Sequence, residues 1–296
     1  MRQWIAFAIL SIAWGANFLW IKVGVQEIGP LMLVAWRLGF DLLGMLVVMR
    51  VGQISFPRDV NTWLKLVLLG MINPAIPFVL IAWGEQRIAS GLAAVLNSTM
   101  PLFVLILAHF LLQDERMSLR KSLGLAVGFG GVFVIVMRSP NVNETSSTFF
   151  GYLAVLLATF SYAFGAVYVR RYLRDISPVV QTACMLLVAE VLLWVAVAVF
   201  ETPHVWPSLR DTWISIVWLG ILGTTVGYLM FFYLIREWGA TRSSLVTYVL
   251  PVIGLVLGIV FLGESIDARL WVGTTLVLCG IVIVNRRVAR PLPRIS

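Results

Sequence analysis

Charged residues are scarce in this chain. Of its 296 residues, 12% are charged and 60% are hydrophobic, whereas a soluble domain carries about a quarter charged residues. So few charges cannot cover a surface that faces water. The composition excludes a soluble globular protein and predicts an integral membrane protein.

Cysteine, histidine and phosphate-binding loops are also scarce or missing. The chain has two cysteines and two histidines, and Cys184 and Cys279 both fall inside apolar segments, where a cysteine is a small core residue. No G-x-x-x-x-G-K-[ST] loop occurs, and no room is left for a nucleotide-binding domain. We therefore predict no cofactor, no metal centre and no ATP-driven transport, unless a partner chain supplies the ATPase.

Hydrophobic segments fill almost the whole chain. A bilayer core about 30 Å thick needs about 20 apolar helical residues per crossing. Ten segments meet this requirement, and short loops separate them. They cover residues 4–24, 31–50, 63–83, 90–112, 120–137, 149–169, 179–200, 213–235, 243–262 and 270–285. The predicted fold class is an all-α integral membrane protein with ten transmembrane helices.

The net charge of +8 reflects an uneven distribution of lysine and arginine. If the N-terminus lies in the cytoplasm, 16 of the 22 basic residues fall on the cytoplasmic side, five fall on the other side, and Arg37 lies inside the second span. Membrane proteins carry such an excess in their cytoplasmic loops. We predict a multi-pass protein of the cell inner (plasma) membrane with both termini in the cytoplasm, and no nucleic-acid partner.

The sequence repeats itself after 148–150 residues. "PLFVLILAHFLLQDE" begins at Pro101 and "PVIGLVLGIVFLGE" at Pro251, and the two segments end on Glu115 and Glu264. Further pairs align at the same offset: Pro30 with Pro178, Gly70 with Gly220, Gly124 with Gly273, and Gly131 with Gly280. The chain is therefore predicted to consist of two similar units.

Each unit contains five spans, an odd number, so the second unit enters the membrane from the opposite side. Inverted repeats of this kind are a design of secondary transporters, which open a midplane site first to one side and then to the other. The prediction is two inverted five-helix repeats that work by alternating access. The predicted parts are a first repeat over 1–138, a polar linker over 139–148, a second repeat over 149–287 and a basic cytoplasmic tail over 288–296.

Four prolines stand inside the predicted spans. A proline inside a helix removes a backbone hydrogen bond and clashes with the preceding turn. In a membrane, the freed carbonyls persist only where protein or water surrounds them. We expect these prolines to bend helices beside a cavity or to act in gating, although shaping the bundle alone would also explain them. They are Pro74, Pro77, Pro101 and Pro251.

The ends of both units resemble a known family. "PVIGLVLGIVFLGE" followed by "WVGTTLVLCGIVIV", and "PLFVLILAHFLLQDE" followed by "SLGLAVGFGGVFVIV", resemble the end of the EamA-type repeat of the drug/metabolite transporter superfamily. "SIAWGANFLWIKVG" and the pair Trp36-Arg37 are similar to that family too. The resemblance covers nearly the whole chain. The resemblance implies a basket of ten helices around a cavity lined by spans 1, 3, 4, 6, 8 and 9. The family includes exporters of amino acids, aromatic ones among them.

The spans that would line this cavity offer neutral polar and aromatic side chains. Amides, hydroxyls and freed carbonyls can hold an ammonium and a carboxylate without net charge, and aromatic faces accept apolar groups or a cation. Because Trp and Tyr also gather at membrane interfaces, each aromatic residue could instead be an anchor. The predicted substrate-binding residues are Trp14, Asn17, Phe18, Asn73, Phe78, Asn97, Ser98, Tyr162, Thr224, Tyr228, Thr247 and Tyr248.

Three ionisable residues lie at membrane depth, where a charge is costly and needs a partner. Arg37 and Asp41 are four residues apart in the second span, so they can pair on one helix face. We expect this pair to pin the helix outside the cavity, with a gating or coupling role as the alternative. Glu190 has no evident partner within its span, and it could titrate with protons or bond a neighbouring helix.

These features predict an alternating-access transporter of small neutral metabolites, foremost an amino-acid exporter with an uncharged cavity. Phosphorylated substrates need cations, and the middles of the expected lining spans have none. The alternative is a cationic drug exporter that uses Glu190 for proton coupling. Two other classes of protein are considered as alternatives. An intramembrane enzyme would need a catalytic set that His109 and Glu190 alone do not form. A non-transporting scaffold would bind a partner protein without moving a solute.

The predicted partners are a small-molecule substrate and the lipid bilayer, with both a monomer and a homodimer left open. The glycines of the fifth and tenth spans bear on this choice, because glycine permits close helix contact. Gly124, Gly128, Gly273 and Gly280 are expected to pack helices within one bundle, and a homodimer seam is the alternative.

Overall fold

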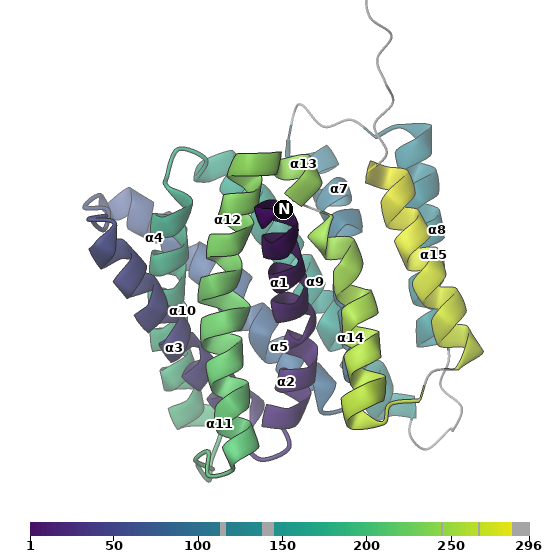
Figure 1. The fold of residues 1–296 in the computed structure, drawn as a ribbon, viewed down its shortest axis with the longest axis horizontal. Helices are drawn as coiled ribbons and strands as arrows, with labels where there is room; N and C mark the ends of the chain where they lie inside the picture. Colours follow the sequence, from purple (N-terminus) through teal and green to yellow (C-terminus); the bar gives the residue numbers. More distant parts are fainter. Residues whose placement is uncertain (113–116, 138–144, 244, 266, 286–296) are drawn as a thin grey trace, which may run out of the picture.

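The computed structural model describes residues 1–112, 117–137, 145–243, 245–265 and 267–285. Within these ranges the chain forms helices and no β-strand (Figure 1). Only residues 145–148 of the predicted linker are described. The predicted tail over 288–296 and Glu115 lie outside the described residues.

The first half forms five helical stretches, two of them interrupted by a break and one by a π-helical segment, η1. Their bounds are α1 (Arg2–Gly15) and α2 (Asn17–Gly24); α3 (Pro30–Val51); α4 (Val60–Gly70), η1 (Met71–Ala75) and α5 (Ile76–Glu85); α6 (Ser90–Asn97) and α7 (Met100–Leu111); and α8 (Leu119–Val136).

The second half forms five more stretches, one of which contains a second π-helical segment, η2. Their bounds are α9 (Thr145–Tyr172); α10 (Pro178–Phe200); α11 (Arg210–Val217), η2 (Trp218–Val226) and α12 (Gly227–Trp238); α13 (Ala240–Ser243) and α14 (Val246–Leu262); and α15 (Ala268–Asn285). In the described ranges, nine stretches are long and apolar enough to cross a membrane, and α14 is a shorter tenth. The predicted ten-helix fold is confirmed, and each predicted end lies within four residues of the observed one.

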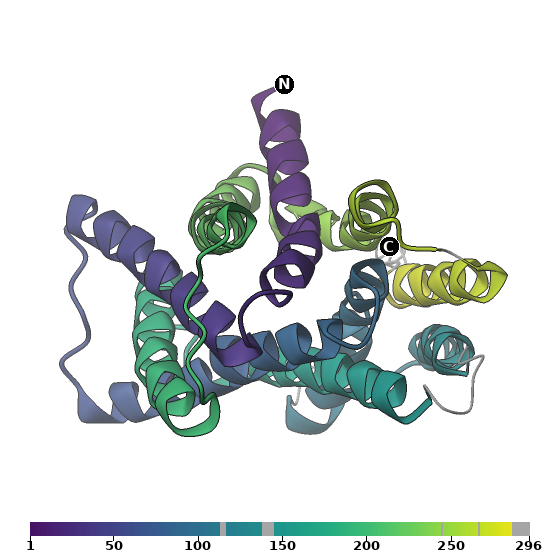
Figure 2. The same ribbon diagram turned by 90° about the horizontal axis from the view of Figure 1, so that it is seen from below.

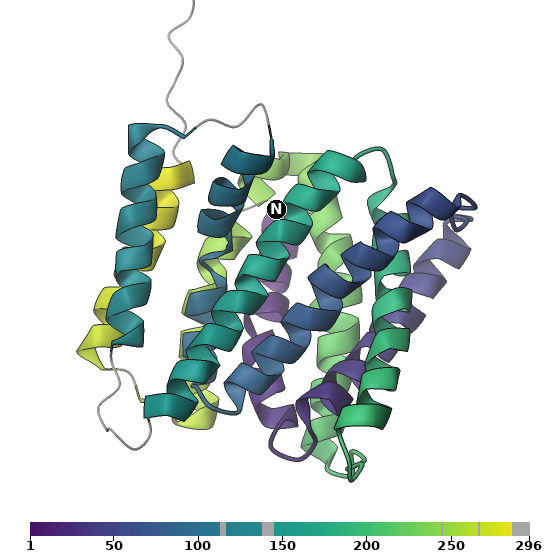
Figure 3. The same cartoon turned by 180° about the vertical axis from the view of Figure 1, so that it is seen from behind.

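Helices of the two halves pack against one another in symmetric pairs. α3 packs on α10, α6 on α14 and α8 on α15, and each of these pairs joins equivalent helices of the two halves. α5 packs on α9 and α1 on α12, and a two-fold axis would exchange these two pairs. This pattern is what inverted repeats related by a two-fold axis produce. Figures 1 and 3 show α8 and α15 at one end of the long axis, with α3, α4 and α10 at the other.

The outer surface of the bundle is apolar. Large hydrophobic side chains are exposed along α3, α10, α14 and α15, among them Leu43, Val195, Phe261 and Val272. A soluble protein rarely exposes contiguous apolar surface of this kind, and lipid tails would cover it. The surface therefore agrees with a protein that spans a bilayer.

Glycines bring α8 and α15 into backbone contact. A Cβ atom added at Gly131 would lie 2.6 Å from the Gly273 carbonyl oxygen, and one at Gly280 would lie 2.5 Å from the Gly128 Cα. Residues without a side chain permit this approach. The glycines that were expected to pack tightly are thus used inside one molecule.

The third span passes through two prolines by widening into the π-helix η1. In a π-helix the carbonyl of Ile72 would accept the N–H five residues later, but that residue is Pro77, which has none. Ser161 of α9 supplies the donor, and its Oγ lies 2.6 Å from the Ile72 oxygen. The predicted bend therefore frees a carbonyl that a neighbouring helix uses.

The fourth and ninth spans differ in how they accommodate their prolines. Pro101 lacks the N–H that the Asn97 carbonyl would accept in a continuous helix, and the chain breaks between α6 and α7. Pro251 lies inside α14, which continues through it, because one missing hydrogen bond does not outweigh the packing of α14 on α6 and α1. The two equivalent prolines are thus accommodated differently, and a role of either in gating stays a prediction.

Two faces of the bundle are used as references below. The N-terminal face carries the start of α1 and the ends of α3, α7, α9 and α12. The opposite face carries the ends of α2, α5, α10 and α14. Figure 2 views the bundle from below, along the helices of its central part.

Candidate functional site

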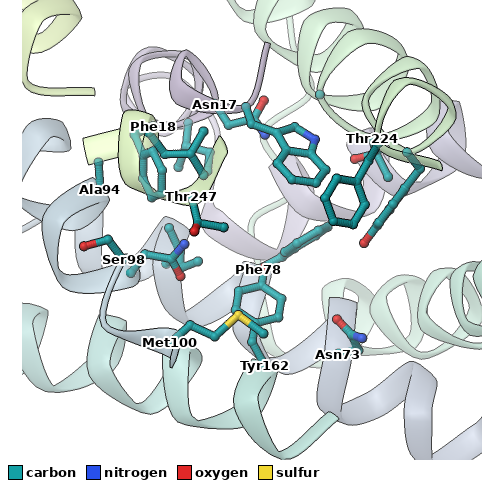
Figure 4. Close-up of a pocket in the computed structure, with 18 of the residues that line it drawn as sticks. Asn17, Phe18, Asn73, Phe78, Ala94, Ser98, Met100, Tyr162, Thr224 and Thr247 are labelled. Carbon is teal, nitrogen blue, oxygen red and sulfur yellow. The ribbon is translucent and has the colours of Figure 1, made fainter. Parts of the chain in front are cut away.

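A cavity of about 360 Å³ lies between the two halves. This volume falls in the range of about 300–1,000 Å³ that is usual for small-molecule sites. Eleven of the twelve residues predicted to bind substrate line it, and Figure 4 shows most of them around one space. They are Trp14, Asn17, Phe18, Asn73, Phe78, Asn97, Ser98, Tyr162, Thr224, Tyr228 and Thr247. That they bind substrate stays a prediction.

The helix breaks and π-helical segments bring these polar groups together. Asn73 lies in η1 and Thr224 in η2, and these two segments belong to equivalent spans of the two halves. π-Helical turns are often found at functional sites. Asn97 and Ser98 stand at the break between α6 and α7, where the Ser98 hydroxyl donates to the Val95 carbonyl at 2.6 Å. Irregular backbone thus lies where it borders a cavity, as expected inside a membrane.

Tyr248 does not line the cavity. Its hydroxyl accepts a hydrogen bond from the Asn285 side chain of α15. A one-residue step along a helix turns the side chain by about 100°, so Thr247 faces the cavity and Tyr248 turns toward α15. Both residues were predicted to bind substrate, and the structure brings only Thr247 to the cavity.

Pro101 borders the cavity, whereas Pro74, Pro77 and Pro251 are not among its lining residues. Pro74 and Pro77 are buried and shape the third span behind Asn73 and Phe78. Their contribution to the site is thus the backbone geometry that presents these two side chains. Phe231 of the eighth span also lines the cavity. Residues that the sequence did not single out complete the wall, namely Ile21, Ile81, Ala94, Met100, Ala166, Gly223 and Leu250.

Arg37 also lines the cavity, so the expectation of an uncharged cavity is wrong. α3 was not expected to reach the cavity, but it packs against both η2 and α5. This places the Arg37 guanidinium between Thr224 of η2 and Phe78 of α5. Its Nη2 donates to Thr224 Oγ1 at 3.3 Å, and its Cζ lies 3.8 Å from the centroid of the Phe78 ring.

The predicted pairing of Arg37 with Asp41 is present but loose. Arg37 Nε lies 4.0 Å from Asp41 Oδ2, and both side chains are buried. A direct hydrogen-bonded ion pair spans about 2.7–2.9 Å. Asp41 is not a lining residue, so it balances the charge of Arg37 from behind.

Glu190 lies away from the cavity and has a partner in its own helix. Trp194, one turn later on α10, donates from Nε1 to Glu190 Oε1 at 2.8 Å. Glu190 also approaches Gly39 of α3, where an added Cβ would lie 3.0 Å from the same oxygen. The expectation that it has no partner within its span is wrong, because the indole N–H of a tryptophan one turn later is a hydrogen-bond donor.

Glu85 is a buried carboxylate that the sequence analysis missed. It is 0% exposed at the end of α5, and neither of its carboxylate oxygens accepts a hydrogen bond within the described ranges. The Lys22 ammonium lies close by and donates to the backbone carbonyls of Glu85 and Ile88. Both residues belong to the opposite face and do not line the cavity.

The cavity opens toward the N-terminal face. Its lining residues nearer that face, such as Trp14, Met100 and Leu250, are half-buried. Those nearer the opposite face are buried, for example Ile21 and Ala94 at 4% and 1% exposure. The site is therefore closed toward the opposite face.

Three carboxylates, called here the inter-repeat clasp, join the two halves on that opposite face. Each accepts from backbone N–H groups at or just before the start of a helix in the other half, where such donors are otherwise unpaired. Glu264 accepts from Ser90 N at 2.6 Å and Gly91 N at 3.0 Å, Glu201 from Met32 N at 2.6 Å, and Glu27 from Ser208 N at 2.8 Å and Leu209 N at 3.0 Å.

These contacts perturb the pKa of Glu27 and of Glu201 in opposite directions. Burial alone would raise the pKa of Glu27, but hydrogen bonds from Ser208, Thr212 and Leu209 lower it to about 2. Burial raises the pKa of Glu201, although the Met32 N–H and the charge of His204 act the other way. The lowered pKa keeps Glu27 in its anionic form over the ordinary pH range.

Among the described residues, the counterpart of Glu27 on the N-terminal face makes no such contact between the halves. The 148-residue offset aligns Glu27 with Asp175. The Asp175 carboxylate is 90% exposed and pairs with the adjacent Arg174 at 3.7 Å. On the closed side of the cavity the carboxylate of Glu27 is therefore bonded to the other half, whereas on the open side the carboxylate of Asp175 is exposed.

Comparisons with known proteins agree with this arrangement. Residues 2–137 and 149–286 each match the EamA-like transporter family. An uncharacterized transporter of Archaeoglobus fulgidus is 29% identical over 293 residues, which cover 97% of this chain and 100% of that protein. The uncharacterized inner membrane transporter YedA of Escherichia coli is 27% identical over 285 residues, which cover 95% of this chain and 89% of YedA. A solved crystal structure shares the fold, with a TM-score of 0.66 at 19% identity over 95% of this chain and 96% of that one.

Proposed function

The chain belongs to the EamA-like transporter family, and from that premise we propose that it is an alternating-access exporter of amino acids, above all those with aromatic or apolar side chains. The observation that carries this proposal is the cavity, which is lined from both halves, open toward one face and closed toward the other. Alternating access requires such a site between inverted repeats. The inter-repeat clasp would have to break when the site turns to the opposite face.

The chemistry of the cavity supports a zwitterion with an apolar side chain. Aromatic rings such as Trp14, Phe18 and Tyr228 offer apolar surface and a cation-binding face. Amide and hydroxyl groups offer hydrogen bonds, and the Arg37–Asp41 pair adds no net charge. A substrate without net charge therefore leaves the buried site electrically balanced.

The basic residues support an orientation with the N-terminal face in the cytoplasm. We count 16 of the 22 lysines and arginines on that side of the topology. The cavity would then be open to the cytoplasm, from which an exporter takes its substrate. The membrane would be the cell inner (plasma) membrane, and YedA is named an inner membrane transporter.

The cationic drug exporter has less support. It needs a carboxylate that meets the cation, and Glu190 is not a lining residue. No other aspartate or glutamate lines the cavity in the described ranges. A cationic dye therefore serves as the competing substrate in the test.

The test is counterflow in proteoliposomes that are preloaded in turn with phenylalanine, leucine, glutamate, lysine or a cationic dye. We expect phenylalanine and leucine to exchange, and Asn17→Ala and Tyr228→Ala to reduce the exchange about tenfold or more. Asn61→Ala and Tyr172→Ala make the same changes at exposed positions and should leave it unchanged. Exchange of the dye alone would refute the proposal.

Direction is tested in cells. Cells that overproduce an exporter of aromatic amino acids should tolerate a toxic analogue such as fluorophenylalanine, because they expel it. Increased sensitivity of these cells would show that the protein imports its substrate.

A further inference from the structure

Arg37 is the one charged side chain among the described residues that line the cavity. Its Nη2 donates to Thr224 Oγ1 at 3.3 Å, and in the described part of the chain the guanidinium makes no other hydrogen bond. A guanidinium has five N–H donors. Most of the donors of Arg37 are thus unused: Nε is buried without a partner, and the residue lines the cavity although it is only 4% exposed.

Asp41 compensates the charge of Arg37 without using these donors. It is 0% exposed, and neither of its carboxylate oxygens accepts a hydrogen bond within the described ranges. The distance of 4.0 Å from Arg37 Nε to Asp41 Oδ2 exceeds that of a direct charge-assisted hydrogen bond by about 1 Å. The pair is neutral as a whole, but its positive end faces the cavity.

Phe78 packs against the guanidinium of Arg37. The Arg37 Cζ lies 3.8 Å from the centroid of the Phe78 ring, a distance at which cation and ring attract each other. The ring covers one face of the guanidinium, and the N–H groups lie in the guanidinium plane. Such an arrangement offers an edge of parallel donors to a planar anionic group.

We propose that Arg37 is the receptor for the substrate carboxylate and that Asp41 neutralises the guanidinium while the site is empty. The planar fork of an arginine matches a carboxylate with two parallel hydrogen bonds. This inference rests on the proposed function, because it names the group by which an amino acid is recognised. A phosphate dianion would add a second negative charge beside Asp41, so a single carboxylate suits the site better.

The first test uses the wild-type protein and four ligands that share one aromatic ring. They are phenylalanine, hydrocinnamate (no amine), phenethylamine (no carboxylate) and phenylalaninamide (carboxylate replaced by a neutral amide). Competition in counterflow and thermal stabilisation of the detergent-purified protein report binding. We expect the two carboxylates to bind at least about tenfold more tightly than the amine and the amide, since hydrogen bonds to charged groups are the strong ones.

The second test removes the receptor. Arg37→Gln combined with Asp41→Asn deletes both charges, so that no unpaired charge is left buried. We expect the preference for carboxylates to vanish in the double variant and to be partly kept in Arg37→Lys, which retains the charge but not the fork. Arg87→Gln is the matched control, because Arg87 also stacks on an aromatic ring, that of Trp83 at 3.5 Å, but does not line the cavity.

The outcomes separate this inference from the proposed function. If phenylalanine exchanges but the amide and the amine compete equally well, transport of amino acids stands and the Arg37 receptor is refuted. If hydrocinnamate exchanges and phenylalanine does not, the receptor stands and the amino-acid assignment falls. If the double variant does not fold, Arg37→Lys and the wild-type ligand series still decide, and a carboxylate preference unchanged in Arg37→Lys would overturn the receptor.

Discussion

At the scale of the residue, the carboxylate of Glu190 is bound by the neighbouring side chain of Trp194. The Trp194 indole donates to Glu190 Oε1 at 2.8 Å, while Oε2 is buried without a partner. The indole N–H needs a hydrogen-bond acceptor, and this acceptor does not have to be charged. A neutral amide at position 190 would still provide that acceptor through its oxygen.

We therefore predict that Glu190→Gln keeps amino-acid exchange close to the wild-type rate and does not lower stability. Burying a neutral amide costs less than burying a carboxylate, so the apparent Tm should stay equal or rise. Counterflow and thermal unfolding in detergent measure the two quantities. A loss of exchange in Glu190→Gln with an unchanged Tm would restore the proton-coupled alternative.

At the scale of the element, the π-helix η1 depends on a donor from another helix. The Ile72 carbonyl accepts from Ser161 Oγ at 2.6 Å, because Pro77 offers it no N–H. Asn73 follows directly and lines the cavity. The geometry of the site is thus tied to one hydroxyl on α9.

Ser161→Ala should leave this carbonyl without a partner and lower the free energy of unfolding by about 1–3 kcal/mol. Substrate exchange should fall as well, because Asn73 loses its fixed position. Ser215→Ala is the matched control, since Ser215 Oγ donates to the Asp211 carbonyl of its own helix at 2.8 Å, and that carbonyl belongs to the ordinary helical pattern of α11. Equal effects of the two variants would argue against the role of Ser161.

The contact between α8 and α15 provides a second prediction for an element, with its control at the next residue. Gly131→Ala should cost about 1–3 kcal/mol by overpacking, because the added Cβ would lie 2.6 Å from the backbone oxygen of Gly273. Gly130→Ala meets nothing within 4 Å and should be neutral or gain up to about 1 kcal/mol in helix propensity. In thermal unfolding, Gly131→Ala should therefore lower the Tm, whereas Gly130→Ala should leave it unchanged or raise it. A Gly131→Ala variant as stable as the wild type would contradict the close packing.

For the whole molecule, the inter-repeat clasp joins the two halves on the closed face by hydrogen bonds from backbone N–H groups to carboxylates. Glu27, Glu201 and Glu264 each bind backbone N–H groups of the other half. Anions are stabilised at helix N-termini. Opening toward the opposite face must break these bonds, so the clasp should bias the transporter toward the conformation seen here.

Glu27→Gln should weaken the clasp in a pH-dependent way. The pKa of Glu27 is lowered to about 2 in the folded protein, from about 4.3–4.5 in an unfolded chain. Its stabilising effect is therefore fully present above about pH 4.5 and is lost as the pH falls through about 2. The wild-type protein should unfold at a higher temperature than Glu27→Gln by a constant margin from pH 8 to pH 5, and this margin should shrink below about pH 4.5.

The exposed Glu237 of α12 is the control, and Glu237→Gln should behave as the wild type. A margin between wild type and Glu27→Gln that grows on acidification would show that Glu27 does not act as a bound anion.

Composition and repetition were sufficient to predict the membrane fold, and the resemblance to the EamA-type repeat indicated which spans line the cavity. Helix length follows from the thickness of the bilayer, which every span must match by itself. Eleven of twelve predicted binding residues line one cavity, because polar groups and prolines are tolerated inside a membrane mainly beside such a space. Tyr248 was misplaced because one residue of rotation along a helix cannot be read from a polar cluster.

Contacts between distant segments, by contrast, were decided by the tertiary structure alone. Arg37 is brought to the cavity by the packing of α3 on η2 and α5, and Glu27 meets Leu209 from 182 residues away. Neither contact leaves a periodic signal in the sequence, since each depends on how whole helices lie against one another. The sequence by itself therefore determined which residues must avoid water and lipid, and the packing of the two halves decided which of them meet in the site.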